Sequence, residues 1–421
     1  MFMNLIQLSS LRNLHTFDSW IAYKNYRFIW VGNFFGNNAQ WLQLLTVGWL
    51  VRDLTIGSST SSLLVITVGA INTLPGLVVG PWAGVLGDRV DRRKLLMLIQ
   101  TFMAVMAISF ALLMLSGKIM VWHAYAYVII SGICRSFAMP LRQALIANTV
   151  PREALGNALA ANVLTITSSR LFGPFFGGVL IATLGFSWNF VLEAGFYVCM
   201  VLSLLPMKTP YREPGKARVN KSPAADLKEG ILYIWKGERI IFFLIMLSLV
   251  PNVIIQPFMF LLPVFTDEIL GRGADVGGAL LAINGAGGFL AAFIIASVGF
   301  IFKKGMVVFG TAVLSCVVVI LLSFTPWLAP AIIMIALLGF SQSTFRTTNS
   351  TLIQSLVPDE LRSRVTSLRS YGQGFVVFTS LLIGWIADLS SASVAIMIMG
   401  GFGLAMTLAY LLIARRVRKL S

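Results

Sequence analysis

The chain has 421 residues, of which 57% are hydrophobic and only 11% are charged. Soluble domains carry about 25% charged residues, so this composition excludes an ordinary soluble enzyme. The 30 Phe and 10 Trp residues also exclude a disordered chain, which would lack such surface to bury. Basic residues outnumber acidic ones by 32 to 16, and almost all of them lie between apolar runs. They therefore indicate membrane topology and not nucleic-acid binding.

Twelve apolar runs are long enough to cross the hydrocarbon core of a membrane. Six precede and six follow the hydrophilic segment 207–239, which we interpret as a cytoplasmic linker. The sequence therefore predicts an all-α membrane protein with twelve transmembrane helices in two six-helix halves, 28–206 and 240–413. In chain order the runs are 28–51, 61–83, 95–115, 119–140, 156–182, 187–206, 240–264, 276–301, 306–324, 329–350, 366–386 and 393–413.

The distribution of Lys and Arg predicts that both termini lie in the cytoplasm. With the N-terminus inside, 26 of these residues are cytoplasmic, three are external and three lie within the runs. This is the bias that the positive-inside rule describes. The N-terminal segment 1–27 and the basic tail 414–421 are then cytoplasmic, and Arg142 is counted in the turn after the fourth run. No removable signal peptide is evident at the start of the chain.

Two short sequence matches relate the halves. Residues 143–153 (QALIANTVPRE) match 350–360 (STLIQSLVPDE) at an offset of 207. The tripeptide Ala-Ile-Asn that ends at Asn72 recurs at Asn284, at an offset of 212, in the second and eighth runs. Because each match falls in corresponding runs, we predict pseudo-symmetric halves. Transporters with such parallel repeats bind their cargo between the halves, near the middle of the membrane.

The loop between the second and third runs reads GVLGDRVDRRK over residues 84–94. This pattern resembles the cytoplasmic loop signature of the major facilitator superfamily, although Asp91 replaces its second glycine. The layout of residues 17–415, including Trp41 and Arg170, resembles the bacterial subgroup that contains the enterobactin exporter. The resemblance implies alternating access, a location in the bacterial cytoplasmic membrane, and a cavity lined by the first, fourth, seventh and tenth helices.

The loop signature also implies a latch between the halves. In this resemblance Asp88 faces the start of the eleventh helix, where a carboxylate accepts hydrogen bonds from free backbone N–H groups. Arg92 and Arg93 are expected to pair with acids on the same face, and Gly84 and Arg89 complete the signature. The alternative is that the loop is only a positively charged cytoplasmic turn.

The fifth run contains Gly173-Pro174-Phe-Phe-Gly177-Gly178. This sequence resembles the end of a motif found in exporters of the superfamily, although larger residues stand where that motif has its earlier glycines. Small residues at this spacing allow helices to approach closely, so we expect Gly173, Pro174, Gly177 and Gly178 to serve helix packing.

Four charged side chains fall well inside the runs, where ionisable groups are costly and are functional candidates. Arg170 lies near the centre of the fifth run. Arg135 and Arg346 lie nearer the cytoplasmic ends of theirs, where snorkelling to the surface is an alternative. Glu193 is the only carboxylate well inside a run. We predict that the arginines line the substrate cavity and that Glu193 takes up a proton; a structural Arg170–Glu193 ion pair is the alternative.

Side-chain amides mark a polar face on two runs. In the first run Asn33, Asn37 and Gln40 are spaced four and then three residues apart, so they share one side of a helix. In the seventh run, its counterpart in the second half, Asn252 and Gln256 also share a side. We predict that these five residues line the cavity, and the alternative is that they bind neighbouring helices together.

No phosphate-binding loop, metal-ligand set or nucleophile–base pair is present, so the chain is not expected to be an enzyme or to need a cofactor or metal. The predicted function is proton-coupled export of a small anionic or neutral amphipathic molecule, such as a siderophore. A multidrug efflux transporter or a uniporter is the alternative, and a non-transporting membrane receptor or scaffold is an alternative of another class. The expected partners are the cargo, the lipid bilayer and protons, without nucleic acid, and a monomer is expected.

Overall fold

The computed structural model describes residues 17–76, 78–79, 90–211, 239–298, 303–357 and 374–418, and the elements in this part of the chain are all helical. The first half contains α1 (Asp18–Ala22), α2 (Lys24–Leu54), α3 (Ser61–Ile71), α5 (Arg92–Leu115), α6 (Val121–Ala147), the short η3 (Arg152–Ala154), α7 (Leu155–Leu184) and α8 (Phe186–Leu204). The second half contains α10 (Arg239–Leu249), η4 (Val250–Ile254), α11 (Pro257–Val264), η5 (Phe265–Ile269), α12 (Ala274–Val298), α13 (Lys304–Leu322), α14 (Leu328–Leu356), α16 (Val376–Leu389), α17 (Ala392–Ile413) and α18 (Arg415–Arg418).

The helices confirm the all-α membrane fold. Among the described residues, nine helical segments are long and apolar enough to cross a membrane, and two shorter apolar helices fall in the second and eleventh predicted runs. The remaining run, the first, is α2, which is 31 residues long but carries many side-chain amides. The predictions for Gly84, Asp88 and Arg89 and for most of the linker lie outside the described residues, as do those for the first 16 residues and the last three.

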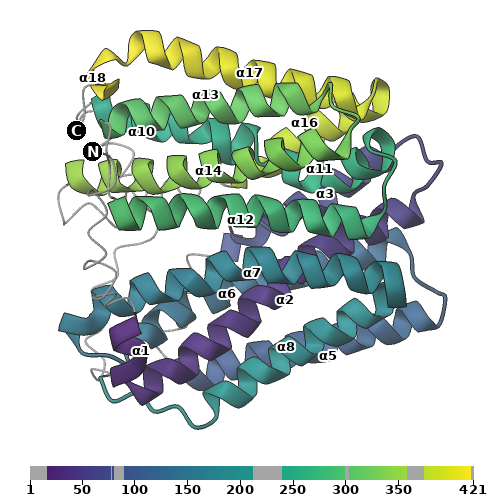
Figure 1. The fold of residues 1–421 in the computed structure, drawn as a ribbon. Helices are drawn as coiled ribbons and strands as arrows, with labels where there is room; N and C mark the ends of the chain where they lie inside the picture. Colours follow the sequence, from purple (N-terminus) through teal and green to yellow (C-terminus); the bar gives the residue numbers. More distant parts are fainter. Residues whose placement is uncertain are drawn as a thin grey trace, which may run out of the picture.

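The two halves form two helical bundles that lie side by side (Figure 1). They meet mainly where α7 packs on α12 and where α3 packs on α16. One hydrophobic cluster of buried residues includes Ile66 of α3 and Ile383 of α16, so it joins both halves. Two further clusters lie within single halves, one around Tyr26 and the other around Phe345.

The predicted internal repeat has a structural counterpart. In the first half, the Asn72 side chain donates to the carbonyl of Val128 on α6, 3.3 Å away. In the second half, Asn284 donates to the carbonyl of Ile335 on α14, 3.4 Å away. The carbonyl oxygens of these two asparagines also closely approach Gly132 and Gly339, respectively, where a Cβ atom would clash. The same helix contact is therefore built twice, as two pseudo-symmetric halves require.

The seventh predicted span is interrupted in the middle of the bundle. It is divided into α10, the π-helical η4 and α11. Pro257 has no N–H to donate to the carbonyl of Val253, four residues earlier. The hydroxyl of Thr379, on α16, donates to that carbonyl instead, at 2.7 Å. The interruption therefore leaves the carbonyl of Val253 with a hydrogen-bond partner. The helix bends near Asn252 and Gln256.

Polar contacts join the halves at the distal end of the bundle, which we define as the end opposite to α1 and α18 (Figure 1). Arg52, near the end of α2, forms ion pairs with Asp267 at 2.8 Å and with Glu268 at 3.0 Å, both in η5. Asp388, near the end of α16, accepts hydrogen bonds from the first backbone N–H groups of α3: Ser62 at 2.9 Å and Leu63 at 3.0 Å. In this state the distal ends of the halves are therefore held together.

A seam of glycines allows α7 and α12 to touch along their backbones. A Cβ atom at Gly178 would lie 2.7 Å from the carbonyl oxygen of Ala274, and one at Gly278 would lie 2.5 Å from that of Pro174. A Cβ atom at Gly285 would lie 2.7 Å from the carbonyl oxygen of Arg170. We call Gly178, Gly278 and Gly285 the glycine seam. Because no side chains separate these helices, the seam brings the mid-membrane residue Arg170 directly to the boundary between the halves.

Candidate functional site

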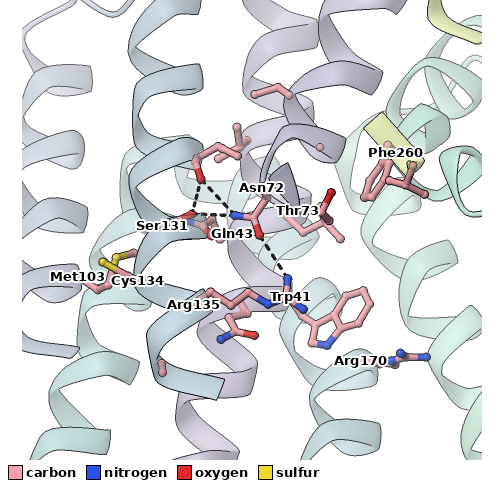
Figure 2. Close-up of a pocket in the computed structure, with 18 of the residues that line it drawn as sticks. Trp41, Gln43, Asn72, Thr73, Met103, Ser131, Cys134, Arg135, Arg170 and Phe260 are labelled. Atoms are coloured by element: carbon pink, nitrogen blue, oxygen red, sulfur yellow. Dashed lines mark hydrogen bonds between the residues drawn. The ribbon is translucent and has the colours of Figure 1, made fainter. Parts of the chain in front are cut away.

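A pocket of about 210 Å³ lies between the two halves. Helices α2, α3, α5, α6, α7 and α8 line it from one side, and η4, α11, α14 and α16 line it from the other. Figure 2 shows that the side chains of Trp41, Asn72 and Arg135 converge on it. Its polar lining residues comprise Gln40, Gln43, Asn72, Thr73, Gln100, Ser131, Arg135, Arg170, Tyr197, Asn252, Gln256 and Arg346. Polar groups gathered in a cavity at the interface of two bundles are typical of a small-molecule site.

Three arginines line this pocket, and they come from both halves. Arg135 projects from α6, Arg170 from α7 and Arg346 from α14. Among the described residues that line the pocket there is no Asp or Glu. Arg170 lies within electrostatic reach of both Arg135 and Arg346. The pocket is therefore a positively charged site in a medium of low dielectric constant, where an anionic group would be strongly attracted.

Within the described part of the chain, Arg170 is held by an aromatic ring and not by an acid. Its guanidinium carbon lies 5.0 Å from the ring centre of Trp41, an arrangement that attracts a cation to the face of the indole. Its Nε atom is buried and has no hydrogen-bond partner. Arg170 therefore keeps hydrogen-bonding capacity that a bound anion can use.

Arg135 is held by a small polar network at the end of α3. It donates to the side-chain oxygen of Asn72 at 3.3 Å, and Asn72 in turn donates to the hydroxyl of Ser131 at 2.9 Å (Figure 2). The helix α3 ends at this point, and Thr73 follows in a turn that also faces the pocket. The network thus fixes the position of Arg135 relative to the C-terminal end of α3.

The predicted amide cluster divides into two groups. Gln40, Asn252 and Gln256 line the pocket, as do Arg135, Arg170 and Arg346. Asn33 and Asn37 do not belong to the described pocket lining, so the structure departs from the cavity prediction for these two. Asn33 donates to the side chain of Asn162 at 2.8 Å, and Asn37 donates to the hydroxyl of Thr165 at 3.1 Å. Their side of α2 faces α7, so they connect helices, which was the alternative interpretation.

Glu193 lies behind the pocket wall. It is only 1% exposed and is not among the lining residues, whereas Tyr197, one turn later on α8, is. The hydroxyl of Tyr127 donates to its Oε1 atom at 2.9 Å. Glu193 and Arg170, both in the described part of the chain, form no ion pair. The structure therefore does not support the alternative of a buried Arg170–Glu193 pair.

Arg142 is a buried cation that the sequence analysis placed in a cytoplasmic turn. The helix α6 continues through Pro140 to Ala147, so Arg142 lies within it and is 5% exposed. It donates to the side-chain oxygen of Asn37 at 3.1 Å and to the sulfur of Met200 at 3.4 Å. The fourth run, 119–140, is therefore shorter than the helix, because a helix in a membrane can continue past a proline.

The described part of the basic loop stabilises helix ends. Asp91 caps α5 by accepting from the backbone N–H groups of Arg93 at 2.9 Å and Lys94 at 3.2 Å, which explains an acid where the superfamily signature has glycine. Arg93 donates to the carbonyl of Leu204 at 2.8 Å, and also to that of Leu205 at the end of α8. Arg92 donates to the side chain of Asn148 at 3.0 Å. Among the described residues, Arg93 contacts free helical carbonyls and no acid, so the structure does not show the predicted pairing with an acid.

The packing motif of the fifth span lies at close helix approaches. A Cβ atom at Gly173 would lie 2.9 Å from the Trp41 Cβ, and one at Gly177 would lie 2.7 Å from a methyl group of Leu42, both on α2. Pro174 and Gly178 contact α12 on the opposite side of α7. The four motif residues thus hold α7 between α2 and α12.

Two pseudo-symmetric helical bundles with a polar pocket between them define a major facilitator transporter. The structure of a point mutant of the nucleoside transporter NupG has this fold: the TM-score is 0.72 at 12% identity, over 92% of this chain and 99% of that one. Residues 18–420 match the model of the transmembrane secretion effector family. The chain belongs to this family, and it is a multi-pass membrane transporter of small molecules.

Relatives with assigned cargo are similar over most of the chain. The staphyloferrin A transporter of Staphylococcus aureus is 25% identical, over 91% of this chain and 94% of its own length. The enterobactin exporter EntS of Shigella flexneri is 23% identical, over 79% and 74% respectively. The multidrug resistance protein MdtG of Enterobacter lignolyticus is 25% identical, over 86% and 84%. The relatives thus include transporters of siderophores and of drugs.

Proposed function

We propose that this chain exports a small anionic molecule, of the siderophore class or another secreted metabolite, across the bacterial cytoplasmic membrane. The observation that carries the proposal is the pocket lined by Arg135, Arg170 and Arg346, without an acid among its described lining residues. A cationic drug would have to enter against three positive charges. A neutral amphipathic cargo would gain nothing from the positive charge of the pocket, so we place it second.

We propose that the chain acts as a monomer with both termini in the cytoplasm. The distal end then faces outward, and the contacts of Arg52 and Asp388 describe a state closed to the outside. In that state the pocket receives cargo from the cytoplasm, and the halves then rock so that the distal end opens. The latch proposed for Asp88 would hold the cytoplasmic ends together in the opposite state.

We propose that proton entry drives this export and that Glu193 carries the proton. What supports the proposal is that Glu193 is buried within a span and separated from the pocket only by residues of its wall, such as Tyr197. An isolated buried carboxylate is costly as an anion and is a typical proton carrier in membrane transporters.

The proposal is tested in inside-out vesicles from cells with and without the protein. The probes are a carboxylate siderophore, a catechol siderophore and the cationic dye ethidium, each with and without a proton uncoupler. We expect uptake of at least one anionic probe, and we expect the uncoupler to abolish it. Preferential uptake of ethidium would contradict the anionic cargo, and uptake that ignores the uncoupler would contradict proton coupling and indicate a uniporter.

A further inference from the structure

The route from the pocket to Glu193 passes through one side chain of the pocket wall. Tyr197 lines the pocket, and it lies four residues after Glu193 on α8, so the two share one side of that helix. Both side chains are buried, and Glu193 and Tyr197 are electrostatically coupled neighbours. The Oε2 atom of Glu193 is buried and has no hydrogen-bond partner in the structure. A proton acceptor is therefore available on the far side of the phenol.

A second tyrosine contacts the same carboxylate but has a different environment. Tyr127 donates to Oε1 of Glu193 at 2.9 Å, yet it is not among the residues that line the pocket. Its ring packs on Phe110 at 4.7 Å and on Phe190 at 5.5 Å between ring centres. Besides these rings, the pocket residue that faces Tyr127 is Gln43, whose amide is neither an acid nor a base near neutral pH. Tyr127 is therefore suited to positioning the carboxylate and not to exchanging a proton with the pocket.

We propose that Tyr197 is the relay through which protons pass between the pocket and Glu193, and that Tyr127 only positions the carboxylate. This inference rests on the proposed role of Glu193 as the proton carrier. In the loading step a hydronium ion in the pocket gives a proton to the phenolic oxygen of Tyr197 while the phenolic O–H bond breaks toward Glu193. The tyrosine is unchanged, the carboxylate becomes a carboxylic acid, and the hydronium ion is left as water. Unloading runs in reverse.

The charges around Tyr197 favour such a transfer. Among the described residues, its ionisable neighbours besides Glu193 are Tyr127, Cys134, Arg135 and Arg142, all on α6. From α2, Gln43 faces the neighbouring Tyr127 and also lines the pocket. The two guanidinium groups stabilise the negative charge that forms transiently on the phenolic oxygen while its proton moves. Arg142 is itself held in place by Asn37, which gives this side chain of α2 a positioning role.

The test is infrared difference spectroscopy of the purified, detergent-solubilised full chain after a rapid pH change. It needs no cargo, because it records the carbonyl band of protonated Glu193, which is identified by its absence in E193Q. We expect Y197F to slow the appearance of this band at least tenfold. We expect Y127F, the matched control, to shift the band position but to leave the rate within twofold. Tyr197→His, which restores an exchangeable proton, should recover most of the rate.

The outcomes separate the two proposals. If E193Q removes no band from the wild-type difference spectrum, Glu193 does not take up a proton and the proposed coupling fails. If the band is present but Y197F leaves its rate unchanged, or Y127F slows it equally, the relay is wrong while the carrier role of Glu193 survives. Size-exclusion profiles establish folding, and Tyr197→Met serves as the second hydroxyl-free variant if Y197F does not fold.

Discussion

Arg170 combines three contacts in one residue. Its guanidinium group lies over Trp41, its side chain lines the pocket, and its backbone touches α12 at Gly285. Because the carbonyl of Arg170 lies against the other half, any movement of that half changes the surroundings of the pocket charge. Cargo binding and movement of the halves therefore act on the same residue.

The first prediction concerns the charge at this position. We expect Arg170→Gln to raise the KM for an anionic siderophore about 10- to 100-fold, because a charged hydrogen bond contributes about 1.5–3 kcal/mol. Arg170→Lys keeps the charge but loses the planar group over Trp41, so its KM should lie between those of the wild type and Arg170→Gln. The measurement is initial uptake in inside-out vesicles. Equal KM values for all three proteins would show that Arg170 does not contact the cargo.

At the residue scale, the sequence predicts which side chains are unusual but not what they face. Depth and helical face predict Arg170, Gln40 and Gln256 for the cavity, and all three line the pocket. Their contact with cargo stays a prediction. Asn33 lies on the same helix as Gln40, but seven residues earlier, where its side chain meets Asn162 of α7. Tyr197 was missed, although its spacing of four residues from Glu193 is visible in the sequence.

The ends of α2 and α16 and the start of α3 make the polar contacts that join the halves at the distal end. The ion pairs of Arg52 are partly exposed, with 13% of its side chain accessible, so each contributes less than a buried pair would. The two hydrogen bonds to Asp388 stabilise the start of α3, where no other side chain caps the helix. We expect these contacts to set the balance between the two states of the transporter.

The second prediction concerns these polar contacts at the distal end. We expect Arg52→Gln or Asp388→Asn to increase the fraction of molecules open at the distal end several-fold, because each removes about 1 kcal/mol from the closed state. The measurement is electron paramagnetic resonance distance analysis between spin labels at Ile56 and Ser390. Arg27→Gln, at the other end of α2, is the matched control. A distance distribution that stays unchanged in both variants would contradict the proposed role.

The third prediction concerns the glycine seam. We expect Gly278→Ala to lower the unfolding free energy by about 1–3 kcal/mol, because its Cβ would overlap the backbone of α7. Gly310→Ala in α13 meets no atom within 4 Å and should leave stability unchanged or slightly higher. Thermal unfolding in detergent measures both. Equal melting temperatures for the two variants would show that the backbones are not in contact.

On the scale of the whole molecule, the charge balance of transport can be worked out. Export of one anion in exchange for one entering proton moves two positive charges inward. Each charge gains about 2.3 kcal/mol per 100 mV, so an inside-negative potential of that size supplies about 4.6 kcal/mol per cycle. A membrane potential alone should therefore drive export.

The fourth prediction is that transport is electrogenic. In proteoliposomes without a pH gradient, a potassium diffusion potential set with valinomycin should accelerate transport of a monoanionic siderophore at least threefold when its sign attracts protons into the cytoplasmic side. The opposite sign should slow it. A rate that is independent of potential would indicate electroneutral transport, and hence a different charge on the cargo or a different coupling ion.

The whole architecture was the easiest part to predict from the sequence. Apolar runs of membrane length and the Ala-Ile-Asn repeat give twelve spans in two halves, because each depends on local composition alone. The interruption at Pro257 was not predicted, since the carbonyl it frees is satisfied by Thr379, more than 100 residues away. Contacts between distant helices, such as the ion pairs of Arg52, depend likewise on the packing of the complete bundle.

The glycine seam has a consequence for how the two halves recognise each other. At the glycine seam, α7 and α12 contact each other through their backbones. The fit of the two halves there depends on helix shape and not on interdigitating side chains. Two separately synthesised fragments, ending and starting within 215–235, should therefore assemble into a working transporter. A half from a relative with larger residues at these positions would clash with the backbone of the other half. Chimeric transporters made by recombination between such relatives should therefore fail to assemble.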